Sequence, residues 1–142
     1  MTTADRSRLV FHGAIVLFVG LLCGFPAVAG VVVEALQGWR KAHLSIVVLG
    51  LWLLATAGIY PSLLLSKRHP NALNCSLFVA GYSLTVASIL MAITGMHGFR
   101  PTGPAANWAV FSLRVIGGLG ALLAVLLTAI GAHSSVIAAN KR

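Results

Sequence analysis

His43 is the residue of this chain whose type and position are best suited to chemistry. It follows the run GWRKA at positions 38–42 and opens a long apolar stretch. Haem iron and soft metals bind a neutral imidazole, and a histidine at the mouth of a membrane span can supply one without burying a charge. A histidine in such a place can also be an ordinary interfacial residue. His43 is therefore the candidate ligand on which the function depends, and both interpretations are open.

Two residues on the same helix face bear on this choice. Val47 and Gly50 follow His43 at i+4 and i+7, so a helix places them beside it. Gly50 lacks a side chain two turns below the imidazole, where a flat macrocycle such as haem can lie against the helix. The alternative is that Gly50 serves close helix packing. Val47 and Gly50 are thus candidate cofactor contacts next to His43.

Arg114 is a second unusual residue. It lies about six residues inside the last apolar stretch, roughly 9 Å from its end in a helix. An arginine at that depth is costly unless it snorkels to the headgroups or meets an anion. Together with Arg40 and Arg100 at the same level, it is a candidate partner for the acidic groups of a cofactor, such as haem propionates. Snorkelling is the alternative.

The remaining sequence shows which elements must position these residues. Of the 142 residues, 58% are hydrophobic and 8% are charged, whereas a soluble domain carries roughly 25% charged residues. A membrane-spanning helix needs about 20 apolar residues, and four stretches provide them, at 9–33, 42–65, 73–96 and 108–133. Open strand edges are not satisfied in lipid, so these stretches are predicted to be helices. The short links between them predict a single all-α integral membrane domain over 1–142, a four-helix up-down bundle.

The net charge of +8 is interpreted as a topology signal and not as a sign of nucleic-acid binding. Basic residues at 6, 8, 67, 68, 141 and 142 fall on one side of the predicted bundle, and those at 40, 41 and 100 fall on the other. The positive-inside rule then places both termini in the cytoplasm. The expected partner of this basic surface is the lipid bilayer, and nucleic acid is not expected.

Small residues and the other histidines add expectations about packing. The spacing Gly20-x-x-x-Gly24 in the first stretch, and the glycines between Gly117 and Gly120 in the last, predict close helix contacts. His12, His69 and His133 lie near the predicted cytoplasmic side and are expected to be interfacial or solvated. No Ser-His-Asp set, metal-spaced cysteine pair or phosphate-binding glycine loop is present, so the familiar soluble enzyme classes are excluded.

Several short motifs together resemble the membrane-embedded styrene-oxide isomerases. They are Gly38-Trp39-x-x-Ala42-His43, Pro61-Ser62-Leu63 eighteen residues after the histidine, His12-Gly13, and Gly81-Tyr82, where that family has Gly-Trp. The resemblance covers most of the first three stretches and is weak in the fourth. It implies four-helix subunits in a homotrimer, with haem b at the subunit interfaces and His43 as its axial ligand. The iron would then act as a Lewis acid.

Two departures from that family point to a different substrate. Leu49 stands where the isomerases have an asparagine, and Ser88 stands where they have a tyrosine, the residues that orient the epoxide. Leu49 and Ser88 are therefore candidate pocket residues beside His43. The length, the opening segment 1–13 and the four-helix layout look more like the hydroxylaminobenzene mutases of bacterial membranes. That resemblance implies a multi-pass protein of the bacterial inner membrane that rearranges a small aromatic substrate, hydroxylaminobenzene, to 2-aminophenol by intramolecular hydroxyl transfer, with iron acting on the N–O bond.

Other functions are open on the same residues. The chain can be an epoxide isomerase of the styrene-oxide type, a haem-binding electron-transfer subunit in which His43 and His97 both bind iron, or a membrane scaffold without a cofactor. A dry apolar pocket favours the mutase over the first of these, because excluding water keeps solvent from attacking the ring.

Overall fold

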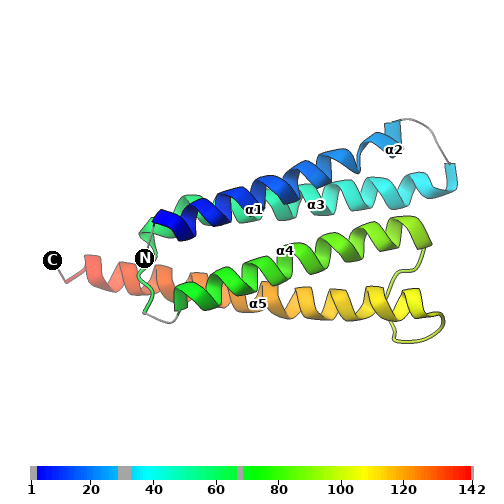
Figure 1. Cartoon of the computed structure of the whole chain (residues 1–142). Helices are drawn as coiled ribbons and strands as arrows, with labels where there is room; N and C mark the ends of the chain where they lie inside the picture. The colour runs from blue at the N-terminus through cyan, green and yellow to red at the C-terminus, as the bar shows by residue number, and fades with distance from the viewer. Residues whose placement is uncertain (1–2, 29–32, 67–68, 142) are drawn as a thin grey trace.

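Helices are the only regular secondary structure among the described residues of the chain. The computed structural model describes residues 3–28, 33–66 and 69–141. Their elements are α1 (Thr3–Leu22), α2 (Phe25–Val28), α3 (Val33–Ile59) with its 3₁₀ continuation η1 (Tyr60–Ser62), α4 (His69–Thr94) and α5 (Ala105–Ala139). Figure 1 shows the four long helices running in alternating directions, with the two chain ends at the same end of the bundle. The predicted all-α fold is confirmed.

Three of the long helices have the length and apolarity needed to cross a membrane. Within the described residues these are Leu36–Ser62, His69–Thr94 and Ala105–Ala139. The helix α1 has 20 residues, but Asp5, Arg6 and Arg8 occupy its first turns. Its apolar part therefore begins at Leu9 and is shorter than the ~20 residues of a typical span.

The predicted ends of the helices differ from the observed ones, most of all in the first half of the chain. The first predicted span, 9–33, is interrupted because α1 ends at Leu22 and a turn at residues 23–24 precedes the short α2; residues 29–32 of that span lie outside the described residues. The predicted link 34–41 is instead helical and belongs to α3. The physical reason is that apolarity marks the part of a helix that lies in lipid, whereas polar residues continue the same helix beyond it.

Glycines set the distance between the long helices. A Cβ at Gly20 would lie 2.7 Å from the Val47 nitrogen, and one at Gly50 would lie 2.6 Å from the Leu17 nitrogen, so α1 and α3 touch through their backbones. At the other seam, a Cβ at Gly117 would lie 2.6 Å from Leu84 Cγ of α4. The predicted close contacts at Gly20 and Gly117 are therefore confirmed, and they join helices of the same chain.

The helices pack mainly against their neighbours in chain order, α1 on α3, α3 on α4 and α4 on α5, while α1 also touches α4. Side chains fasten α1 to α3 at two levels. Near the chain ends, Arg6 Nε donates to the Ala57 carbonyl at 3.2 Å. At the opposite end, the His43 ring bonds to the Gly20 carbonyl. These two bonds fix where α1 lies along α3, and one of them involves the candidate ligand.

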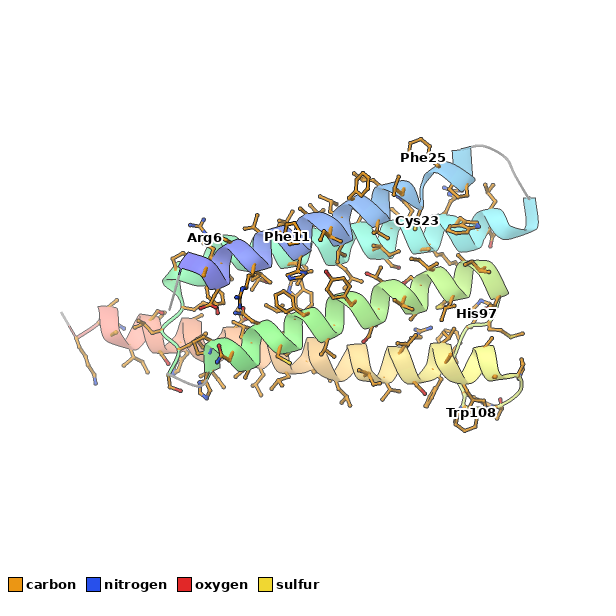
Figure 2. All side chains as sticks on the ribbon, viewed as in Figure 1. Arg6, Phe11, Cys23, Phe25, His97 and Trp108 are labelled. Atoms are coloured by element: carbon orange, nitrogen blue, oxygen red, sulfur yellow. The ribbon has the colours of Figure 1, made fainter. Side chains whose placement is uncertain are left out.

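The end of the bundle opposite the termini carries exposed aromatic residues. Figure 2 shows Phe25, His97 and Trp108 at this end, while Arg6 lies toward the termini. Phe25 and Trp108 are both largely exposed, as expected for rings at the level of lipid headgroups. We refer to this end, which also holds His43 and the 95–104 loop, as the outer end.

Candidate functional site

The His43 imidazole is held in one orientation by α1. Its Nδ1 lies 2.7 Å from the Gly20 carbonyl oxygen. A carbonyl only accepts hydrogen bonds, so Nδ1 carries the proton and the lone pair of the neutral ring is on Nε2. Nε2 has no hydrogen-bond partner among the described residues. This is the arrangement found around histidines that bind metals, where the second nitrogen donates to a carbonyl and fixes the tautomer.

Two glycines of α1, Gly20 and Gly24, form the surface against which this imidazole packs. A Cβ at Gly24 would lie 3.0 Å from His43 Nδ1 and 3.3 Å from Cε1, which is too close for an ordinary contact. Gly24 therefore leaves the space that the ring fills, while Gly20, one turn earlier, provides the carbonyl. The Gly20-x-x-x-Gly24 spacing predicts helix packing alone, and the contact of both glycines with His43 is visible only in the structure.

Val47 and Gly50 serve the contact between α1 and α3. Val47 packs against the position of the missing Gly20 side chain, and Leu17 fills the space next to Gly50. The macrocycle expected at Gly50 therefore has no room there within the chain, which corrects that expectation. Gly50 has the packing role that was its alternative.

A groove runs along the other side of α3. Its volume is about 950 Å³, within the range of small-molecule sites. Residues of α3 and α4 form its walls, and the 95–97 segment with Arg114 of α5 closes its outer end. Leu49 and Ser88 both line this groove, so the structure brings the two predicted pocket residues together.

His43 does not face this groove. The groove residues of α3 include Lys41, Ser45 and Val48, and no residue of α1 lines it. Successive residues of a helix are about 100° apart, so Ser45 lies roughly 200° around α3 from His43. His43 faces α1, whereas Leu49, Ser88 and Arg114 face the groove. A single chain therefore does not assemble all the predicted site residues at one point.

Arg114 has partners within its own chain. Its Nη1 donates to the His97 carbonyl at 2.7 Å, and its guanidinium carbon lies 4.8 Å from the centre of the Phe99 ring. The Met91 sulfur is a further neighbour at 3.7 Å. Neither snorkelling nor an external anion is needed to explain this arginine, because it holds the 95–104 loop against α5. Arg40 and Arg100 are exposed and do not line the groove.

Asn107 and Gly98 hold the 95–104 loop in its conformation, and neither residue was predicted to do so. The Asn107 side chain accepts from the Gly98 N–H at 2.9 Å and donates to the carbonyls of Arg100 and Thr102 at 2.8 and 2.6 Å. Gly98 has φ +58°, and a Cβ there would lie 2.6 Å from Val110 Cγ1. The His-Gly pair at 97–98 was the available signal. Hydrogen bonds from Asn107 thus hold in place the loop whose first residues line the outer end of the groove.

His12 is half-buried and makes contacts within the chain that were not predicted. Its Nδ1 lies 2.6 Å from the Tyr82 hydroxyl, and its ring packs on Phe78 with 4.4 Å between centroids, so it belongs to the contact between α1 and α4. His133 is exposed near the end of α5, as expected. His97 is exposed, stacks on Phe99 and lines the groove. His97 and His43 therefore do not face each other across one site within the chain.

The possible metal-binding side chains of the described residues fit a haem better than a bare metal ion. Among the described residues, no three His, Cys, Asp or Glu side chains gather in a way that could hold a bare metal ion. His43 offers one oriented imidazole nitrogen. One nitrogen suffices for a haem, which brings four in-plane ligands of its own, so the residues present fit this group.

Comparison with known proteins adds one match. A family model described as styrene oxide isomerase matches residues 5–133, which is most of the chain. No curated protein and no solved structure matches the chain.

Proposed function

Because the chain belongs to the styrene oxide isomerase family and is thus an isomerase-type membrane protein, we propose that it is a haem b-dependent hydroxylaminobenzene mutase. The reaction converts hydroxylaminobenzene to 2-aminophenol. The N–O bond breaks, a C–O bond forms at the ortho carbon, and the hydrogen of that carbon is replaced by one on nitrogen. Substrate and product are isomers, so no oxidant or reductant is consumed.

The observation that carries this proposal is the bond between His43 Nδ1 and the Gly20 carbonyl. It fixes the proton on Nδ1 and leaves Nε2 as the nitrogen that would hold a haem. When bound there, haem supplies a Lewis acid that polarises the N–O bond of the substrate. The carbonyl also keeps the imidazole basic, because it stabilises the positive character that the ring gains when it donates electrons.

The rearrangement needs dry surroundings, and in our proposal the groove provides them once a neighbouring subunit covers it. Leu49, Val48 and Leu84 give it an apolar wall, and residues 95–97 line its outer end. In bulk acid, water attacks the activated ring mainly at the para carbon. A groove that excludes water favours return of the hydroxyl group to the nearer ortho carbon.

The positions of His43 and the groove on opposite sides of α3 support a homo-oligomer. In the trimer that we propose, the unbonded Nε2 edge of His43 in one subunit meets the groove of the next, so that ligand and pocket come together at the interface. Leu44 and Val48 on the groove side of α3 are 62% and 63% exposed in the single chain, so they are available to a neighbouring subunit.

We further propose four spans in the bacterial inner membrane, with α1 as the first. The two chain ends lie at the same end of the bundle (Figure 1), and the greater number of basic residues is found there. By the positive-inside rule this end is cytoplasmic.

The runner-up is an epoxide isomerase of the styrene-oxide type. Leu49 and Ser88 line the groove, yet they replace the two residues that the resemblance assigns to epoxide orientation. Leu49 offers no hydrogen bond, and the Ser88 hydroxyl already donates to the Leu84 carbonyl at 2.8 Å. This lining favours the mutase.

Turnover of both substrates by the purified protein in lipid nanodiscs tests the proposal. We expect hydroxylaminobenzene to give 2-aminophenol, with kcat/KM for styrene oxide at least about tenfold lower because two orienting hydrogen bonds are absent. Product formation is followed by chromatography. Faster turnover of styrene oxide would support the epoxide isomerase instead, and no turnover of either substrate would contradict both assignments.

A further inference from the structure

Three hydroxyl groups line the groove, and two of them are already engaged. Ser88 Oγ donates to the Leu84 carbonyl at 2.8 Å. Thr94 Oγ1 donates to the Leu90 carbonyl at 2.6 Å and accepts from the Met96 N–H. Ser45, on α3, has no hydrogen bond to any described residue and is exposed to the groove. Its O–H is therefore available to a ligand.

The surroundings of Ser45 are mostly apolar. Leu49 lies one turn deeper on the same face of α3, and Leu44 and Val48 flank it. Across the groove, Ala87 of α4 contributes a methyl group. Once a ligand covers it, an unpaired hydroxyl among apolar side chains gains more from a hydrogen bond than one in water does. Polar groups at membrane depth usually face a functional cavity for this reason.

We infer that Ser45 is the substrate-orienting hydrogen-bond donor of the groove. It takes a small, neutral aromatic molecule with an accepting oxygen two bonds from the ring. The ring lies on Leu49 and Val48, and the oxygen accepts from Ser45 Oγ. This inference rests on the proposed function, and it moves the orienting role from Ser88 to Ser45. Lys41, one turn toward the outer end, is not needed by a neutral ligand.

The test uses two unreactive ligands of nearly the same shape. Benzyl alcohol replaces the nitrogen of hydroxylaminobenzene by carbon and keeps the hydroxyl group, whereas ethylbenzene replaces that hydroxyl by a methyl group. Equilibrium binding to the full-length protein in nanodiscs is measured by calorimetry. Comparing variants in the same lipid cancels the partitioning of each ligand into the bilayer.

We expect Ser45→Ala to weaken binding of benzyl alcohol about three- to tenfold, the value of one neutral hydrogen bond, and to leave ethylbenzene unchanged. Ser45→Thr keeps the hydroxyl and should keep the preference for benzyl alcohol. Ser134→Ala, the matched control, should change neither affinity, because Ser134 is not among the residues that line the groove and its hydroxyl donates to the Ile130 carbonyl.

Three results would overturn the inference. The first is an equal loss of affinity for both ligands in Ser45→Ala. The second is a loss of affinity for benzyl alcohol alone in Ser88→Ala. The third is a wild-type protein that binds neither ligand. The binding measurement does not depend on turnover. If the wild type binds benzyl alcohol through Ser45 but does not rearrange hydroxylaminobenzene, the mutase proposal fails and the role of Ser45 is supported.

Discussion

The His43→Gly variant is expected to fold and to purify without haem. His43 Nε2 is the nitrogen that would hold the haem, and among the described residues no cluster of other metal ligands is present to replace it. Loss of a Lewis acid that contributes several kcal/mol should lower turnover about 1,000-fold or more. The Soret absorption per protein and the rate of 2-aminophenol formation measure the two effects.

Two comparisons separate ligation from a structural role of His43. His133→Ala, at an exposed position in α5, should keep both haem and activity. Added imidazole should enter the space left in His43→Gly and restore part of the Soret band, because it supplies the missing nitrogen without the covalent link. Haem bound at the wild-type level in His43→Gly without imidazole would rule out His43 as the ligand.

Replacing Gly24 by valine is expected to lower haem affinity at least about tenfold while His43 stays in place. Even the first carbon of a side chain at Gly24 would lie 3.0 Å from His43 Nδ1. The larger valine side chain must push the ring aside, and the Nδ1 bond to the Gly20 carbonyl is then lost. Haem titration of the apoprotein, followed at the Soret band, gives the change in affinity.

Gly118→Val is the matched control for this change. A Cβ at Gly118 meets no atom within 4 Å, so the same substitution there should leave haem binding unaltered. Circular dichroism and the melting temperature show whether Gly24→Val still folds. A folded Gly24→Val protein with wild-type haem affinity would show that the contact with Gly24 on α1 does not determine the orientation of His43.

The sequence predicted the helices better than their ends. Long apolar stretches and short links were enough for an all-α bundle, and the glycine spacings were enough for the close contacts at Gly20 and Gly117. The start of α3 at Val33 was not predictable from hydropathy, because a helix continues through polar residues once it has left the lipid. The break after Leu22 depends on a local turn that has no strong signal beyond Gly24 and Pro26.

The sequence singled out candidate site residues, but it did not predict their partners within the chain. The position of His43 at the start of an apolar stretch singled it out, and the family resemblance placed Leu49 and Ser88 in one pocket, where the structure brings them together. The partners were not predictable. Arg114 donates to the His97 carbonyl, and His43 donates to the Gly20 carbonyl. Every residue type has a backbone carbonyl, so the sequence does not show which residue will accept such a bond.

Turnover in water enriched in oxygen-18 tests most directly the claim that the hydroxyl group moves within a dry site. We predict that 2-aminophenol will carry mainly the oxygen of the substrate and that little 4-aminophenol will form, because the groove keeps solvent from the activated ring. Mass spectrometry of the product gives the label content, and chromatography gives the ratio of isomers. Extensive incorporation of solvent oxygen, together with the para isomer, would contradict the intramolecular mutase.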